Sequence, residues 1–354
     1  MTGMWLKQVW AVFRLEIGKS FFSKRGLWIY LLALAPVLMF FGHGWVAKRD
    51  AARRSEYNQG ETVSREQLHS LKRGMLKDQV MTRLPNPRSQ RTVETKAGVR
   101  EFLFYSSKEE DLTVRLLDGK VVGLQYRGEC NLDRDKIMFG TVYQIFFLRL
   151  AVFFGCVFVF LNLFRGEILD KSLHYYFLAP VRREIVVLGK YLAGLVATCV
   201  IFSTSAALQL TVLYLHLPKT ALDEYLAGTG WQDAFAYTGV AALACVGYGS
   251  VFLLAGMILR NPLIPAVSIL LWESINSILP AVLRKASVIY YLKSMCPVEI
   301  LSREDVPPVL AMLAVNVEPA TPLVAIGGLC LVALCVVAVA AVYSRRMEIN
   351  YAAE

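Results

Sequence analysis

The chain has 354 residues, of which 56% are hydrophobic, and its 38 lysines and arginines against 28 aspartates and glutamates give a formal net charge of +10. Soluble globular domains are only about 45–50% apolar, so this composition excludes an ordinary soluble protein and favours a membrane protein. The positive charge indicates topology and an affinity for anionic membrane lipid. It does not indicate nucleic-acid binding, because the sequence shows no basic patch interleaved with aromatic residues on a soluble domain.

Residues 1–26 predict an N-terminal cytosolic helix that lies in the membrane interface. Apolar and aromatic residues recur there at helical spacing, while the cations lie elsewhere around the helix. A positively charged leader before the first span is the alternative. The residues at helical spacing are Trp5, Val9, Val12, Phe13, Ile17 and Phe21.

Long apolar runs divide the rest of the chain. A run of about 20 apolar residues is long enough to cross a bilayer as a helix, and the first run is too long for the core of a signal peptide. The predicted fold class is therefore a polytopic α-helical membrane protein. Its six expected transmembrane helices are residues 27–47, 137–163, 191–215, 234–259, 261–283 and 319–344.

Lysine and arginine in the short loops are concentrated on one side of these spans, and that side is expected to be cytosolic. It holds both termini, the segment 164–190 and the tail 345–354. We therefore expect a multi-pass protein of the bacterial cytoplasmic membrane with both termini in the cytosol.

Residues 48–136 predict a small extracytoplasmic α+β domain between the first and second spans. Ser64 and Gln67 form a capping box that opens a helix ending at Gly74, and a second helix covers 76–84. Asp118-Gly119 is a strong hairpin signal. The expected strands are 91–96, 99–105, 112–117 and 120–126.

Three stretches of this insert resemble the BamE-like (SmpA/OmlA-type) domains: KRGMLKDQV at 72–80, LPNP at 84–87 and LDGKVV at 117–122. The resemblance implies a module that binds a periplasmic protein. A spacer that shapes an external cap is the alternative.

Cys130 lies in this insert and Cys296 in the later external segment 284–318. A disulfide between them is an open alternative in an oxidising compartment. The segment 284–318 itself predicts re-entrant or interface-lying helices, because its apolar pieces are too short to span a membrane.

The segment 164–190 is rich in charged residues and lies between two apolar runs. Its cations and anions lie beside apolar and aromatic side chains, which predicts an amphipathic element at the cytosolic face that receives a soluble partner. The charged residues are Arg165, Glu167, Asp170, Lys171, Arg182, Arg183, Glu184 and Lys190.

The chain lacks a nucleotide-binding loop of its own. A P-loop requires GxxxxGK[ST], and the Gly-Lys pairs at 18–19, 119–120 and 189–190 do not fit it. The sequence also lacks HExxH, GxSxG and metal-ligand spacings. We expect no enzymatic activity, no metal site and no cofactor bound by this chain.

Two charged residues lie deep within predicted spans. Arg149 and Glu273 each fall about halfway along an apolar run, near the bilayer centre at a rise of about 1.5 Å per residue, and such residues usually face a bundle interior or an aqueous path. Their opposite signs predict a direct or water-bridged pair, with Asn276 on the same helix face as Glu273. A transport role and a purely packing role both stay open.

Three stretches of the cytosolic segment resemble the first cytosolic loop of the permease subunit of ABC type-2 exporters: RGEILDKSL at 165–173, APVRR at 179–183 and LGKYL at 188–192. The resemblance implies a half-transporter that dimerises with a second permease copy or paralogue and binds a separate ABC ATPase subunit, which carries ATP and Mg²⁺. It implies that the second and fifth spans line the translocation path, which brings Arg149, Glu273 and Asn276 to it. The residues it implies for coupling to the ATPase are Glu167, Asp170, Lys171, Leu173, His174, Tyr176, Arg182 and Arg183.

The leading expectation is thus the permease subunit of an ATP-driven ABC exporter that works by alternating access. The alternative is a non-transport, membrane-anchored envelope assembly factor that presents its external domain to a protein partner. A simple anchor needs neither the charges within the spans nor the charged cytosolic segment, so these features favour the exporter.

Overall fold

The computed structural model describes residues 2–22, 27–57, 63–95, 98–107, 110–128, 132–169, 176, 178, 181–215, 217, 219–259, 261, 263–276, 279–298 and 320–346. The chain is mostly helical and divides into two compact units. We call Met1–Phe40, Lys136–Tyr214 and Leu222–Glu354 the helical unit, and Phe41–Asp135 with Leu215–Ala221 the sheet unit.

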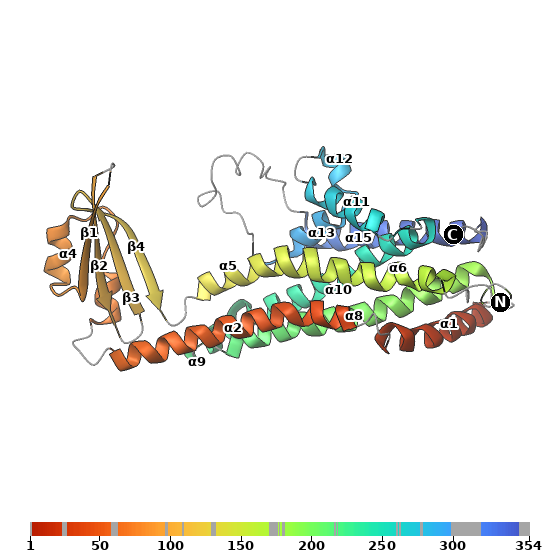
Figure 1. The fold of residues 1–354 in the computed structure, drawn as a ribbon, viewed down its shortest axis with the longest axis horizontal. Coiled ribbons are helices and arrows are strands. Elements are labelled where there is room, and N and C mark those ends of the chain that lie inside the picture. Colours follow the sequence, from red (N-terminus) through yellow and green to blue (C-terminus); the bar gives the residue numbers. More distant parts are fainter. Residues whose placement is uncertain are drawn as a thin grey trace. The chain divides into compact units, whose positions relative to one another are not determined.

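Five helices of the described chain are long and apolar enough to cross a membrane, as expected of a multi-pass helical membrane protein. The apolar part of each covers Leu27–Val46, Asp135–Phe164, Arg183–Leu215, Leu222–Ile258 and Pro322–Arg346. The chain begins with α1 (Thr2–Phe22), which is not one of the five (Figure 1). The first span is α2 (Leu27–Tyr57), and the second consists of α5 (Leu132–Val142), the π-helix η2 (Tyr143–Val152) and α6 (Phe153–Leu169). The third is α8 (Arg183–Leu215), the fourth consists of α9 (Lys219–Tyr225), the π-helix η3 (Leu226–Gly230) and α10 (Trp231–Ile258), and the fifth is α15 (Pro322–Arg346).

Several helices continue beyond the predicted spans. α6 ends at Leu169 and α8 begins at Arg183, so both extend into the segment 164–190 that the sequence predicts as a cytosolic loop. Hydropathy identifies only the part of a helix that lies in hydrocarbon, because charged side chains are costly there. A helix that continues from the bilayer into water stays helical through a polar sequence, so its ends lie beyond the apolar run.

The predicted fifth span, 261–283, is not one continuous helix. α11 (Leu263–Ser274) ends inside it, and the short helices α12 (Ala281–Arg284) and α13 (Val288–Met295) follow. The 12 residues of α11 rise by only roughly 18 Å, whereas the hydrocarbon core of a bilayer is about 30 Å thick. Pro280 forms the N-cap of α12, a position at which its missing N–H costs nothing. Residues 299–318 of the predicted external segment lie outside the described residues.

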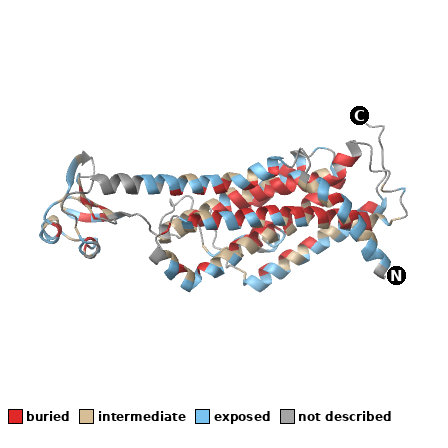
Figure 2. Ribbon diagram, turned by 90° about the horizontal axis from the view of Figure 1, so that it is seen from below, coloured by how far each residue is buried: buried red, intermediate tan, exposed pale blue. Residues whose placement is uncertain are grey.

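The buried residues concentrate in the central helices of the helical unit, where α10 packs against α6 and α15 (Figure 2). Aromatic side chains fill part of this core. The rings of Tyr143 and Tyr237 meet edge to face with 4.7 Å between their centroids, and the ring of Phe139 lies 4.9 Å from that of Tyr237. The Tyr143 hydroxyl also donates to the Tyr237 carbonyl at 2.5 Å. These contacts hold η2 against α10.

The sheet unit contains two short helices and an antiparallel sheet. α3 (Arg65–His69) starts at the predicted capping box, in which Ser64 and Gln67 bond each other's backbone N–H; it ends before the predicted Gly74. α4 (Lys77–Arg83) follows. The strands β1 (Ser89–Thr95), β2 (Gly98–Ser106), β3 (Glu110–Leu117) and β4 (Lys120–Gly128) pair in chain order.

The predicted hairpin turn joins β3 to β4. Asp118 and Gly119 both have positive φ, 49° and 78°, which is the requirement of a two-residue type I′ turn. One face of the sheet is covered, because its apolar side chains form a core with those of the α3–α4 region. That core includes Leu68, Leu71, Val80, Leu84, Leu103, Leu112 and Val114.

Candidate functional site

A buried cluster of charged groups joins α1, the end of α6 and the beginning of α8. Lys190 of α8 is fully buried, and its ammonium lies 2.7 Å from a carboxylate oxygen of Glu167 and 3.0 Å from one of Glu16. The ammonium also donates to the Leu163 carbonyl at 3.2 Å. Because an ammonium carries three protons, each has an acceptor. The cost of burying this cation is thereby offset locally.

Tyr176 and Lys19 extend this cluster toward the surface. The Tyr176 hydroxyl donates to Glu16 at 2.5 Å and accepts from Lys19 at 3.0 Å. Lys19 also lies 3.3 Å from Glu16 and 3.4 Å from Glu167, and its side chain is 58% exposed. Two ammonium groups therefore balance two carboxylates. We call Glu16, Lys19, Glu167, Tyr176 and Lys190 the ion cluster.

The two carboxyl groups of the ion cluster respond differently to their surroundings. Burial favours the neutral form of Glu16, but the charge of Lys190 and the hydrogen bond from Tyr176 outweigh it, so the pKa of Glu16 lies below its ordinary value. Burial has the larger effect on Glu167 and raises its pKa, with repulsion from Glu16 adding to it and attraction to Lys190 opposing it. One oxygen of Glu167, Oε2, is buried without a hydrogen-bond partner among the described residues.

A close approach between α1 and α8 makes the ion cluster possible. A Cβ at Gly189 would lie 2.7 Å from the Cβ of Val12 and 3.2 Å from the carbonyl oxygen of Val9. Only glycine therefore fits at this contact. Among the residues of α1 whose burial is described, Val12 and Glu16 are the buried ones, and they lie one turn apart. The face of α1 that meets α8 therefore carries both the tight packing and the carboxylate.

The predicted coupling residues fall into two groups. Glu167 and Tyr176 belong to the ion cluster, and Glu167 is buried rather than presented to a partner. Arg182 places its guanidinium 4.7 Å from the ring centre of Trp5, and Arg183 donates to the carbonyls of Ser344 and Arg345 at the end of α15, both at 3.4 Å. Asp170, Lys171, Leu173 and His174 lie outside the described residues.

The predicted partnership of Arg149 and Glu273 takes a different form. The Arg149 guanidinium donates through Nη2 to the backbone carbonyl of Glu273 at 3.2 Å. The carboxylate of Glu273 instead accepts from the Ser287 hydroxyl at 2.7 Å and from the backbone N–H groups of Val288 and Ile289 at 3.0 and 2.9 Å. The direct form of the predicted pair, an ion pair of the two side chains, does not occur, and the direct contact runs through the main chain of Glu273.

Glu273 thus caps α13 from a helix that precedes it in the chain. The first N–H groups of a helix lack partners within it, and its N-terminus attracts negative charge. Asn276 supports the same corner, since its amide donates to the Arg284 carbonyl at 3.4 Å. The described structure brings Arg149 and Glu273 together as a junction between η2, α11 and α13, while Asn276 is bonded to the end of α12.

Sequence reasoning missed Glu16 and Lys190 as partners of the coupling segment. Glu16 is the only acidic residue of α1, and its position four residues after Val12 on an apolar face was the available signal. Lys190 appeared only as one cation among several. The hydrogen bond that the Ser287 hydroxyl donates to Glu273 had no signal beyond an N-cap residue type before an apolar run.

No group of three or more His, Cys, Asp or Glu side chains arranged to hold a metal ion occurs in the part of the chain that the structure describes. Two polar sites of the described helical unit include residues that the sequence predicts as functional: the ion cluster, with Glu167 and Tyr176, and the junction of η2 with α11 and α13, with Arg149 and Glu273. No protein-family model, no curated protein and no solved structure matches this chain.

Proposed function

We propose that this chain is the permease subunit of an ATP-driven ABC exporter, which moves its substrate across the bacterial cytoplasmic membrane by alternating access. The observation that supports the proposal best is the ion cluster, in which Lys190 of α8 holds Glu16 of α1 and Glu167 of α6. A force applied to one of these segments reaches the other two, as a rigid-body transition driven from one face requires. The chain has no P-loop, so a separate subunit would bind ATP and Mg²⁺.

The partners in this proposal are an ABC ATPase, docked at the segment 164–190, and a second permease, identical or paralogous. Arg149, Glu273 and Asn276 would lie at the translocation path. The polar character of this junction supports that role, since Arg149 Nε is buried without a hydrogen-bond partner among the described residues. Polar groups of this kind within apolar segments usually mark functional sites.

We further propose six membrane crossings with both termini in the cytosol. The end of α15 contacts the beginning of α8 through Arg183 and through an ion pair of Arg345 with Glu184, and α1 contacts the same part of α8 through Lys190. Both terminal helices therefore lie at one end of the helical unit, as an even number of crossings requires. With 12 and 8 residues, α11 and α13 together would supply a rise of roughly 30 Å for the remaining crossing.

The test is purification of the tagged chain from its native membranes in mild detergent. We expect a P-loop ATPase to co-purify and to show vanadate-sensitive ATP hydrolysis after reconstitution in proteoliposomes. Tyr176→Phe, which removes one hydroxyl from the ion cluster, should reduce this hydrolysis, whereas Tyr343→Phe on α15 should not. Absence of any ATPase from the purified complex would overturn the proposal, and an envelope protein in its place would favour the assembly-factor alternative.

A further inference from the structure

The sheet has a second face, which the α3–α4 core does not use. In antiparallel pairs, residues directly opposite each other project to the same side. Phe102 of β2 lies opposite Arg91 of β1 and Arg115 of β3, and Phe104 lies opposite Thr113. We call the face that carries these side chains the basic–aromatic face.

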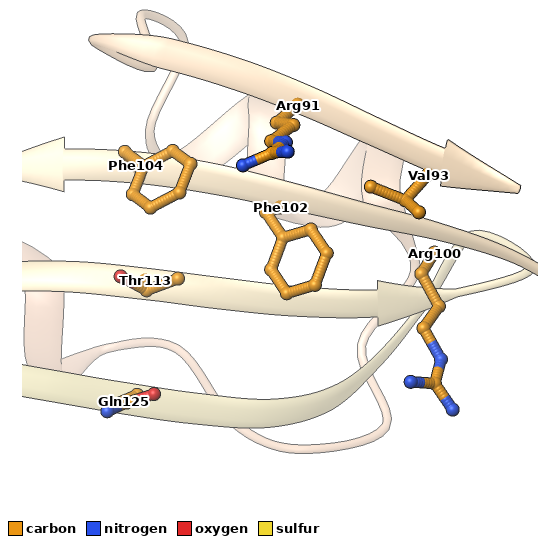
Figure 3. Close-up of a pocket in the computed structure, with 7 residues that line it drawn as sticks. All are labelled: Arg91, Val93, Arg100, Phe102, Phe104, Thr113 and Gln125. Atoms are coloured by element: carbon orange, nitrogen blue, oxygen red, sulfur yellow. The ribbon is translucent and has the colours of Figure 1, made fainter. Parts of the chain in front are cut away.

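A shallow groove of about 450 Å³ runs across this face (Figure 3). Its residues come from all four strands: Arg91 and Val93 from β1, Arg100, Phe102 and Phe104 from β2, Thr113 from β3 and Gln125 from β4. Figure 3 shows the Phe102 ring between the side chains of Arg91 and Arg100, and the Phe104 ring farther along β2, near Thr113 and Gln125.

Arg115 and Gly123 shape the neighbouring part of this face. Gly123 lies opposite Arg115, and a Cβ at this glycine would lie 3.2 Å from Arg115 Nε. The guanidinium therefore lies over the backbone of β4. Together with Arg91 and Arg100, it gives this face three exposed arginines.

The side chains that line the groove indicate the chemical class of its ligand. Phe102 and Phe104 are half-buried although the core of the sheet unit lies on the other face, so they leave apolar surface for an occupant to cover. An apolar centre with arginines around it has the anatomy of a protein interface, in which aromatic residues and arginine contribute most of the binding energy. Guanidinium groups pair with carboxylates through two parallel hydrogen bonds.

We propose that the basic–aromatic face binds an acidic segment of a partner protein, with apolar side chains seated on Phe102 and Phe104 and carboxylates on Arg91 and Arg100. Thr113 and Gln125 offer both donors and acceptors, which suits a peptide backbone. A lipid phosphate at neutral pH supplies acceptors alone. Surfaces that recognise anionic lipid also use clusters of about four to eight lysines or arginines, and two arginines line the groove. This inference does not depend on the exporter proposal.

The experiment uses the full-length chain in nanodiscs of zwitterionic lipid. The probe is a short fluorescent peptide in which glutamate alternates with phenylalanine and leucine, and the same peptide with lysine in place of glutamate is the comparison. We expect the acidic peptide to bind and the basic one not to bind. Arg91→Glu with Arg100→Glu should weaken binding by about tenfold or more, and both changes are at exposed positions that leave the core intact.

The matched control is Lys72→Glu with Arg73→Glu, which makes the same change in net charge at exposed residues of the α3–α4 connection. Equal loss of binding in both double variants would show non-specific attraction and overturn the proposal. Dihexanoyl phosphatidylglycerol serves as a lipid probe. The proposal would also be overturned if this lipid bound the unchanged protein but not the groove variant, and the acidic peptide bound neither protein.

Discussion

The Glu273 carboxylate accepts a hydrogen bond of 2.9 Å from the backbone N–H of Ile289, across the break between α11 and α13. A helix that ends within an apolar segment leaves backbone groups without partners, and in hydrocarbon each such group costs several kcal/mol. The side chain of Glu273 offsets that cost at α13. The residue that looks like an isolated charge in the sequence is thus a cap in the structure.

Replacement of Glu273 by alanine should destabilise the protein by about 2–4 kcal/mol, because three buried donors lose their acceptor. Glu273→Gln should cost less, since an amide oxygen in the place of Oε2 keeps the hydrogen bonds from Ser287 and Ile289. Thermal unfolding in detergent measures both variants. Equal stability of the alanine variant and the unchanged protein would contradict the capping role.

Exchange of the two charges, Arg149→Glu with Glu273→Arg, should not restore what either single change loses. An arginine at position 273 has no acceptor for the N–H groups of α13, and a carboxylate at position 149 would meet the carbonyl that Arg149 now contacts. A double-mutant cycle on unfolding temperature tests this expectation. Recovery in the double variant would instead support a direct pair of side chains.

Removal of the cation from the ion cluster should be costly. Lys190→Met leaves Glu16 and Glu167 buried without their shared partner and should destabilise the protein by about 3–5 kcal/mol. Removal of all three charges, by Lys190→Met with Glu16→Gln and Glu167→Gln, should restore stability to within about 1–2 kcal/mol of the original. Lys7→Met, at an exposed position of α1, serves as the control and should change little.

The two carboxyl groups of the ion cluster should give pH dependences of opposite sign. The folded state lowers the pKa of Glu16 from its ordinary 4.5, so its stabilising effect is present above that pH and is lost as the pH falls through the folded pKa. The folded state raises the pKa of Glu167, so stability is lost as the pH rises above the ordinary value and the carboxyl must ionise in the buried site.

Relative to the unchanged protein, Glu16→Gln should therefore become less stable as the pH rises from about 3 to the ordinary value of 4.5. Glu167→Gln should become more stable as the pH rises from 4.5 to about 7. Unfolding temperatures of the three proteins across this range provide the measurement. Parallel curves for the two variants would show that the cluster responds as a single group.

The C-terminus should be cytosolic. A green fluorescent protein fused after residue 354 should fluoresce, and alkaline phosphatase at the same point should be inactive, because the side of the spans that is rich in lysine and arginine is expected to be cytosolic. Fusions at Thr2 provide the matched comparison for the other terminus. Opposite results at the two ends would require an odd number of crossings.

The sequence predicts a structural feature well when that feature depends on residues close together in the chain. The capping box at Ser64 and the turn at Asp118-Gly119 are local, since their hydrogen bonds and φ values involve residues a few positions apart. The five apolar helices that are long enough to cross a membrane are similarly evident from hydropathy.

The remaining features depend on contacts between residues far apart in the chain. Glu16 and Lys190 are separated by 174 positions, and nothing in either neighbourhood specifies the other. The break in the predicted fifth span was missed for the same reason. Its apolar composition resembles that of a spanning helix. The hydrogen bonds that satisfy the backbone at the break come from Glu273, and they are seen only when the end of α11 and the beginning of α13 are brought together.

The bonds at Glu273 also determine which parts of the helical unit can move independently. The carboxylate attaches α11 to α13, and the carbonyl of the same residue attaches α11 to η2 through Arg149. Any tilt of α11 must therefore carry the other two elements with it or break buried hydrogen bonds. Glu273 therefore ties η2, α11 and α13 into one rigid group, and a hinge in this region is expected to lie outside these three elements.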